Sequence, residues 1–256
     1  RGSQRILGIY RQPLREGAMI DYIDTKKLQQ FGSLRPRNDR QSIALRLLLD
    51  KKVQLVTLTG IGGGGKTIMA LIAAMDQIDD YEQITVFRPV VEAGQSLGFL
   101  PGTLEEKIAP WARPITDNLE CIIAAREGVA RKLQRTLAGK GEADSPAEIV
   151  RQLLREERLV VDTINHLRGR SLHRRFCIFD EAQNFTRIQI KLAGTRAGEN
   201  TKVVFTGDLE QVDLDVHSTS SGLAALVEYM KGDTVFGHVE FDKSERSYLA
   251  EKIAGL

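Results

Sequence analysis

The chain has 256 residues, of which 42% are hydrophobic and 27% are charged, and its formal net charge is +2. This composition excludes a disordered chain, and the length allows one large α/β domain with appendages or two small domains. A net charge so close to zero does not distinguish between classes of partner. The sequence contains no apolar run of about eighteen residues, so we expect no membrane-spanning helix and a cytoplasmic protein.

The cysteines and histidines favour neither a metal site nor a disulfide. Cys121 and Cys177 lie far apart, and we interpret both as small buried hydrophobic side chains in a reducing compartment. The histidines are not spaced as zinc ligands are, either with one another or with the cysteines.

The N-terminal part of the chain divides into a poorly periodic segment and a helix. Residues 1–35 predict an extension or a connector, and residues 36–256 predict the main domain. The helix is predicted to begin after Asn38, because Asn38 and Gln41 have the spacing of a capping box. Gln41 has a second interpretation, since an amide just upstream of a phosphate-binding loop can donate to and accept from adenine.

The strongest motif is a glycine loop. An apolar run over residues 53–59 predicts a buried strand before it, and residues 68–75 predict a buried helix after it. The loop fits the pattern G-x-x-x-x-G-K-[ST] in this strand–helix context, which a chance glycine-rich turn would lack. We therefore expect it to bind the phosphates of a nucleotide. Its members are Gly60, Ile61, Gly62, Gly63, Gly64, Gly65, Lys66 and Thr67.

Each part of this loop has a physical role in phosphate binding. Glycines allow successive backbone N–H groups to turn inward around phosphate oxygens, and the following helix presents its positive end to them. Lys66 is expected to place a positive charge between the β- and γ-phosphates, and the Thr67 hydroxyl is expected to ligate Mg²⁺.

Residues 83–87 predict a second buried strand, which ends at Arg88 where strands of an open α/β sheet face the ligand. A helical insertion is predicted over residues 90–158, and a short strand is predicted after it, near residues 159–161. Within the insertion, Thr103 and Glu106 have capping-box spacing, and a long helix is predicted to begin at Asp117, which has a weaker capping spacing to Glu120. Another helix is predicted after Ser145.

Basic residues gather on the predicted insertion helix and near two strand ends. A solvated basic face is one interpretation, and a nucleic-acid groove is the other. The candidate RNA contacts are Arg88, Arg126, Arg131, Arg135, Arg168 and Arg170, and Lys132 shares the helix face.

The second chemical centre is an apolar run over residues 175–179 that ends in Asp180 and Glu181. Such a strand delivers both carboxylates to its C-terminal edge, and the alternation of side chains gives them different jobs. We assign Asp180 to Mg²⁺ and Glu181 to the attacking water.

A third apolar run, over residues 202–205, ends in Thr206 and Asp208, and Gln211 follows shortly after. These side chains are expected at the sheet edge that binds phosphate, with Gln211 as a sensor of the γ-phosphate; a capped strand–turn is the alternative. Residues 237–241 predict the last strand, and residues 244–254 predict the last helix, which carries Arg246 near its start.

Together these motifs resemble the PhoH-like ATPases, a branch of the P-loop NTPases related to superfamily 1 helicases. The resemblance covers residues 38–256 and includes two specific runs, Gly-Phe-Leu-Pro-Gly at residues 98–102 and Asp-Glu-Ala-Gln-Asn at residues 180–184. Glu-Arg-Ser at residues 245–247 is most similar to the subgroup whose ATPase domain follows a PIN nuclease domain, so residues 1–35 resemble a connector.

The glycine loop departs from the family pattern at two positions. Gly64 stands where Thr or Ser is usual, and Ile61 stands where a small residue or Pro is usual. The extra glycine raises the entropy cost of ordering the loop on binding.

The resemblance implies a RecA-like α/β fold, with a parallel sheet flanked by helices and joined by right-handed crossovers. It implies ATP and Mg²⁺ as ligands, with Asn38, Gln41 and the glycine loop around the nucleotide. It also implies single-stranded RNA as a partner and a ring-shaped homo-oligomer, a hexamer, in which Arg196 or Arg246 reaches a neighbouring nucleotide.

The expected function is Mg²⁺-dependent hydrolysis of ATP, coupled to RNA binding, translocation or unwinding. An ATP-dependent kinase is one alternative, although the sequence reveals no site for an acceptor hydroxyl. An ATP-loaded switch or scaffold with little turnover is the other. RNA-stimulated hydrolysis would distinguish the motor from both.

Overall fold

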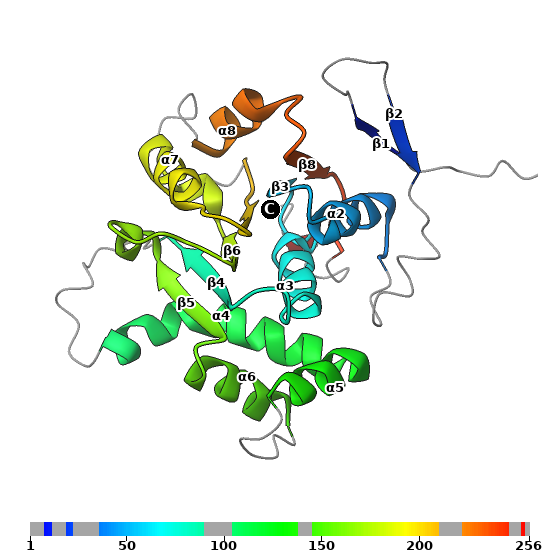
Figure 1. Ribbon diagram of the computed structural model, residues 1–256. Coiled ribbons are helices and arrows are strands. Elements are labelled where there is room, and N and C mark those ends of the chain that lie inside the picture. Colours follow the sequence, from blue (N-terminus) through cyan, green and yellow to red (C-terminus); the bar gives the residue numbers. More distant parts are fainter. Residues whose placement is uncertain are drawn as a thin grey trace, which may run out of the picture.

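A six-stranded sheet forms the centre of the fold in the computed structural model (Figure 1). Its strands lie in the order β5-β4-β6-β7-β3-β8, and every neighbouring pair is parallel. The structure describes residues 8–11, 19–22, 36–89, 104–137, 145–209, 222–245 and 252–253. The predicted parallel α/β fold is confirmed.

The strands of this sheet are short apolar runs, because both of their faces are covered. All the strands that the sequence predicts are present, with small shifts at their ends. They are β3 (Leu55–Gly60), β4 (Gln83–Arg88), β5 (Leu159–Thr163), β6 (Arg175–Phe179), β7 (Lys202–Thr206) and β8 (Phe236–Phe241). A separate antiparallel pair, β1 (Gly8–Arg11) and β2 (Met19–Tyr22), lies in the segment interpreted as an extension and was not predicted.

Helices cover the two faces of the sheet (Figure 1). One core cluster joins the sheet to α2 (Asp39–Leu49), α3 (Lys66–Asp76), α4 (Leu104–Ala124), α5 (Glu127–Thr136) and α6 (Pro146–Arg155). The other joins it to α7 (Arg187–Arg196), α8 (Gly222–Met230) and the 3₁₀ turns η2 (Ile164–Leu167) and η3 (Ala182–Asn184). Alternate residues of β6 belong to different clusters, as the two-residue period of a strand requires.

A row of phenylalanines fixes the register of three strands next to the candidate site. Phe87, Phe179 and Phe205 are in register on β4, β6 and β7, and neighbouring rings stack with centroids 4.8 Å apart. Because side chains alternate along a strand, the residue after each phenylalanine points to the opposite face, where α3 packs. These residues are Arg88, Asp180 and Thr206.

The insertion corrects one prediction. The helix predicted to begin at Asp117 begins at Leu104, and a second helix starts at Glu127. The capping spacing of Asp117 is incidental, because Ile115 and Leu119 on either side of it are fully buried and belong to one continuous helix. The cap at Ser145 is confirmed, since its hydroxyl accepts a hydrogen bond from the Glu148 N–H.

The last predicted helix, over residues 244–254, is described only at its ends. Residues 244 and 245 have no regular structure, whereas residues 252–253 are helical. Within the described residues, the helix therefore does not begin at the predicted position.

The interpretation of the cysteines is half right. Cys177 is buried, and burial raises the pKa of its thiol to about 12. Cys121 is exposed, because it faces outward on α4 between the buried Leu119 and Ile122.

In the described parts of the chain, no three His, Cys, Asp or Glu side chains form a group that could hold a metal ion. In the same parts, no helix is both long and apolar enough to cross a membrane.

Candidate nucleotide-binding site

The glycine loop joins β3 to α3 in a conformation that side chains would not permit. Gly60, Gly63 and Gly65 have φ angles of +108°, +80° and +89°. A Cβ atom on Gly60 would lie 2.1 Å from the carbonyl oxygen of Phe241 on β8. Gly65 is the N-cap of α3 and makes no side-chain capping bond, so the start of this helix is open to an anion.

Lys66 lies against its own loop. Its Nζ atom donates hydrogen bonds to the carbonyl oxygens of Gly60, at 2.6 Å, and of Ile61, at 2.8 Å. These bonds hold the ammonium group inside the loop, where the phosphates are expected. Because a phosphate oxygen is a charged acceptor, it would bind this ammonium more strongly than either carbonyl does.

Asp180 is the centre of a hydrogen-bond cluster beside the loop. Its Oδ1 atom accepts hydrogen bonds from Thr67 Oγ1 and from Thr206 Oγ1, each at 2.7 Å. The Nε atom of Arg88 lies 3.3 Å from the other oxygen, Oδ2. Asp180 is only 4% exposed, so these contacts fix the orientation of its carboxylate.

This cluster fits a Mg²⁺ ion. Mg²⁺ prefers oxygen ligands and is commonly held by one or two protein groups together with phosphates and water. The structure brings together Thr67 and Asp180, the two ligands that the sequence predicts. Thr206 was predicted only to lie at the same sheet edge, and its bond to Asp180 could not be foreseen without the register of β6 and β7.

Glu181 follows Asp180 but faces different neighbours. Its backbone has a φ of +53°, in the left-handed region that non-glycine residues seldom occupy. Its Oε2 atom accepts a hydrogen bond from Gln183 Nε2 at 2.8 Å. The Oε1 atom of Gln183 accepts a second bond, from the backbone N–H of Asp208, at 3.0 Å. Gln183 was not predicted as a site residue, although Gln183 belongs to the Asp-Glu-Ala-Gln-Asn run.

A pocket of about 230 Å³ connects the loop with the acids. Its lining residues come from the junctions after β3, β6 and β7 and from α4. They are Gly62, Gly63, Gly65, Lys66, Thr67, Ile68, Asn118, Asp180, Glu181, Thr206, Gly207 and Asp208. Asn118 was not predicted as a site residue either. The predicted helix start at Asp117 placed Asn118 at the end of a helix, whereas it lies in the interior of α4.

Asn38 and Gln41 connect α2 to the glycine loop. The predicted capping box is confirmed in part: Asn38 Oδ1 caps α2 by accepting a hydrogen bond from the Gln41 N–H at 2.9 Å, but the Gln41 side chain bonds Arg37 in place of the Asn38 N–H. Gln41 Nε2 donates to the Gly64 carbonyl at 3.2 Å, and its Oε1 accepts from the Arg37 N–H at 2.9 Å. Gln41 is 6% exposed, so little of its amide is accessible to a base, and its contact with adenine stays a prediction.

Glu245 closes the loop from the other side. Its Oε1 atom accepts a hydrogen bond from Asn38 Nδ2 at 2.7 Å, and its backbone N–H donates to the Gly63 carbonyl at 3.0 Å. In the Glu-Arg-Ser run, only the arginine was predicted as a site residue. The structure instead connects its glutamate to both the loop and the cap of α2.

The unusual glycine at position 64 has a structural reason. A Cβ atom there would lie 3.0 Å from the Cβ of Phe241, closer than side chains normally approach. The neighbouring Ile61 donates its N–H to the Phe241 carbonyl at 3.1 Å. The loop therefore lies tightly against β8, and a larger residue at Gly64 would require Phe241 to move.

The predicted catalytic residues outside the loop and the acid pair are less directly placed. Gln211 and Arg246 lie outside the described residues. Arg196 ends α7, and its carbonyl accepts a hydrogen bond from the Leu172 N–H, shortly before β6 begins. Arg196 therefore lies towards the N-terminal edge of the sheet and is not among the residues that line the pocket.

The candidate RNA contacts separate into different environments. Arg88 is 17% exposed and faces Asp180, so it belongs to the nucleotide site. Lys132 was interpreted as part of a solvated face, which is wrong: it donates to the Asp76 carbonyl and lies 3.8 Å from Asp79. Arg131 pairs with Glu127 along α5. Arg168 and Arg170 are exposed just after β5, at the sheet edge that carries the pocket, and Arg170 lies 3.4 Å from Asp162.

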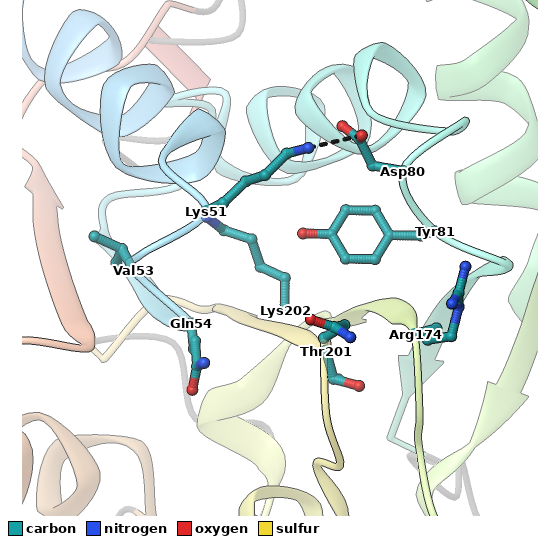
Figure 2. Close-up of a pocket in the computed structure, with 9 residues that line it drawn as sticks. Lys51, Val53, Gln54, Asp80, Tyr81, Arg174, Thr201 and Lys202 are labelled. Atoms are coloured by element: carbon teal, nitrogen blue, oxygen red, sulfur yellow. Dashed lines mark hydrogen bonds and ion pairs between the residues drawn. The ribbon is translucent and has the colours of Figure 1, made fainter.

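A second pocket, of about 220 Å³, lies at the opposite edge of the sheet (Figure 2). Its cations already have protein partners. Lys51 bonds Asp80 at 2.7 Å, as Figure 2 shows, and Arg174 Nε lies 2.8 Å from Glu82. Lys202 donates to the carbonyls of Leu47 and Asp50, both at 2.9 Å. These contacts anchor the end of α2 and the start of β4, which is a structural role.

Comparisons with known proteins show which family the chain is similar to. A family model described as PhoH-like protein matches residues 33–256. The chain is similar to Protein PhoH2 of Bacillus subtilis (strain 168), with 41% identity over 232 residues that cover 89% of this chain and 48% of that one. Protein PhoH of Escherichia coli (strain K12) is 34% identical over 222 residues, which cover 84% of this chain and 56% of that one.

These similarities differ in what they cover. The chain spans about half the length of the curated relatives that it matches. Among solved structures, the Pif1 helicase from Candida albicans aligns with 87% of this chain and 43% of that one, at 12% identity and a TM-score of 0.39. The likeness to this helicase is weak, whereas the match to the family model covers most of the chain.

Proposed function

Because the chain belongs to the PhoH-like protein family and places a buried acid beside a phosphate-binding loop, we propose that it is a Mg²⁺-dependent ATPase. The family and the parallel sheet are those of a nucleotide-binding P-loop protein. ATP as the nucleotide, and hydrolysis as the reaction, are the proposal.

The observation that carries this proposal is the double hydrogen bond to Asp180. Thr67 from the loop and Thr206 from β7 converge on one carboxylate oxygen. Thr67 and Asp180 would hold a Mg²⁺ ion, which supplies positive charge to the β- and γ-phosphate oxygens when it is bound. The two hydroxyl donors and Arg88 fix the orientation of this buried carboxylate, as the groups around a metal ligand do.

The residues of the chain then divide the work of hydrolysis. The loop N–H groups and the start of α3 bind the phosphates, and the Lys66 ammonium moves from the loop carbonyls to the β- and γ-phosphate oxygens. Glu181 accepts a proton from the attacking water as its oxygen bonds to the γ-phosphorus. The bond from that phosphorus to the bridging oxygen breaks, which gives ADP and inorganic phosphate.

Lys66→Ala tests this proposal. We expect it to abolish ATP hydrolysis measured with Mg²⁺, and EDTA should abolish hydrolysis by the wild type. The circular dichroism spectrum and melting temperature without nucleotide should change little, because Lys66 bonds the carbonyls of its own glycine loop and is expected to serve the bound phosphates. Hydrolysis by the variant at the wild-type rate would contradict the proposal.

We further propose that ATP hydrolysis is coupled to single-stranded RNA. The supporting observation is that Arg168 and Arg170 are exposed at the same edge of the sheet as the nucleotide pocket. RNA should stimulate ATP hydrolysis, and its affinity should fall with added salt as phosphate contacts release counterions. Reversing both charges should weaken RNA binding more than the matched reversal of Arg131 and Arg135, which lie on α5.

The same assays distinguish the alternatives. Slow hydrolysis that RNA does not change, with tight ATP binding, would favour a switch or scaffold. Transfer of the γ-phosphate to a hydroxyl acceptor, without release of inorganic phosphate, would favour a kinase.

A further inference from the structure

We infer that Gln183 is a positioning residue, which holds the Glu181 carboxylate in place for proton transfer and ties it to the backbone after β7. This inference rests on the proposed ATPase function and deepens it. Gln183 bonds Glu181 Oε2 with its amide nitrogen and the Asp208 N–H with its amide oxygen. Both ends of one side chain are therefore used to join two separate segments of the site.

The burial of Gln183 makes this arrangement rigid. Gln183 is 2% exposed, so an unused amide group there would carry the cost of an unsatisfied buried polar atom. Glu181, in contrast, is partly exposed and lines the pocket. The buried amide thus supports a carboxylate that a substrate water can reach.

The backbone on both sides of the contact is adapted to it. Gly207 lies so close that a Cβ atom there would be 2.8 Å from Gln183 Oε1, and glycine is the residue that permits this approach. Glu181 has a φ of +53°, a conformation that costs energy and persists only where its surroundings enforce it. The hydrogen bond from Gln183 is one such constraint, because it fixes the end of the Glu181 side chain.

The connection has a consequence for catalysis. The end of β7 supplies Thr206, which orients Asp180, and the segment just after it supplies Asp208, which orients Gln183 and through it Glu181. A shift of this segment would therefore displace the metal-binding acid and the general base together. The register of β7 against β6 places Thr206 next to Asp180, and Asp208 follows only two residues later.

The test is a double-mutant cycle between Gln183→Met and Glu181→Gln. Methionine has a similar volume to glutamine and makes neither hydrogen bond. With Glu181 present, we expect Gln183→Met to lower kcat by about 10²-fold, because misplacing a catalytic group by about 1 Å costs that much. The affinity for ATP with Mg²⁺ should change less than about twofold, because the loop is untouched. In the Glu181→Gln background the same change should have almost no further effect on kcat.

Gln77→Met is the matched control. Gln77 is also a buried glutamine with hydrogen bonds to two segments, because its amide nitrogen donates to the carbonyls of Leu48 and Ala73, but it lies at the far end of α3. It should lower the melting temperature without a comparable loss of kcat. If Gln183→Met does not fold, Gln183→Asn replaces it, since asparagine keeps a polar amide but is one methylene too short to reach both Glu181 and the Asp208 N–H.

The outcomes separate this inference from the proposed function. Wild-type protein that does not hydrolyse ATP with Mg²⁺ would overturn the function. Hydrolysis by the wild type, with equal losses of kcat in Gln183→Met and Gln77→Met, would overturn the positioning role alone. So would a Gln183 effect that is fully additive with Glu181→Gln.

Discussion

Asp180 and Glu181 are adjacent carboxylates with different surroundings. Asp180 is buried among hydroxyl groups and an arginine, whereas Glu181 is partly exposed to the pocket and bonded by an amide. Buried oxygen donors suit a metal ion, and a carboxylate that water can reach suits a general base. The division of work between two like residues is therefore set by the turn that follows β6, which gives the two side chains different surroundings.

Substitutions of the two acids should have different effects. Glu181→Gln should bind ATP with Mg²⁺ normally and hydrolyse it about 10²–10⁴-fold more slowly, because the amide keeps the shape and cannot take a proton. Asp180→Asn should instead raise the Mg²⁺ concentration that half-maximal hydrolysis requires. Mg²⁺ titrations of binding and turnover for both variants would show this, and exchanged phenotypes would refute the assignment.

Gly60 should be far less replaceable than other glycines with positive φ. Gly60→Ala would place its Cβ 2.1 Å from the Phe241 carbonyl oxygen, a backbone atom of β8 that is held by pairing with β3 and by the Ile61 N–H. We expect a loss of more than about 3 kcal/mol in the free energy of unfolding, within the range of severe backbone clashes. The control is Gly169→Ala: Gly169 has a φ of +77° but no atom within 4 Å, so only the backbone cost of about 1–2 kcal/mol applies. Urea denaturation of the two variants measures both values, and equal losses would contradict this prediction.

At the scale of elements, the two ends of β7 make contacts at opposite edges of the sheet. Its last residue, Thr206, reaches the nucleotide site, and its first residue, Lys202, reaches the carbonyls at the end of α2. Lys202 is 1% exposed, and burial lowers the pKa of its ammonium group to about 7, although Asp50 opposes this shift. A neutral amine still has two N–H donors, which is the number that the two carbonyls accept.

This lysine predicts a pH dependence of stability. In the unfolded chain a lysine keeps its proton up to a pKa of about 10.4, whereas folded Lys202 releases it near pH 7. Between these values the unfolded state binds more protons, so the free energy of unfolding should rise with pH, by up to about 1.4 kcal/mol per unit. Denaturation at pH 7, 8 and 9 should show a steeper rise for the wild type than for Lys202→Met. Lys51→Met, at an exposed lysine of the same pocket, should keep the wild-type slope; parallel slopes in all three proteins would contradict the prediction.

At the scale of the whole molecule, Lys66 contributes positive charge to the nucleotide pocket. Among the described residues that line this pocket there is no arginine. Arg88 faces the Asp180 carboxylate, and Arg196 lies towards the opposite sheet edge, about 15 Å away along a five-residue strand. An arginine that acts on the γ-phosphate would therefore come from a neighbouring subunit or from the region of Arg246. We propose a ring-shaped homo-oligomer, with the hexamer as the expected form, in which a neighbouring subunit supplies this arginine.

Mixed rings test this assembly. Lys66→Ala protein mixed with Arg246→Ala protein, and separately with Arg196→Ala protein, should recover ATP hydrolysis in at least one mixture, because an intact loop can then face an intact arginine. An arginine finger contributes roughly 10³–10⁵-fold to such reactions, so recovery would be easily measured. No recovery in either mixture, together with a monomeric mass in solution, would refute the ring.

The sequence by itself determined the elements with local causes. Apolar runs of five or six residues predict the strands, the glycine pattern predicts the loop, and Ser145 and Asn38 predict helix starts, because each depends on residues within a few positions of itself. The phosphate loop and the acid pair could be assigned to one site on the same basis, since parallel strands deliver their C-terminal ends to one edge.

Only the tertiary structure decided how these parts contact one another. Thr206 meets Asp180 across 26 positions of sequence, Gln183 meets Asp208 across 25, and Glu245 meets Asn38 across 207. Such contacts depend on strand register and on stacking of the phenylalanine row, which no local pattern specifies. The same holds for α4, where the burial of Ile115 and Leu119 outweighed a capping signal and brought Asn118 to the pocket. Local chemistry is written in adjacent residues, whereas the geometry of the site depends on packing between segments far apart in the chain.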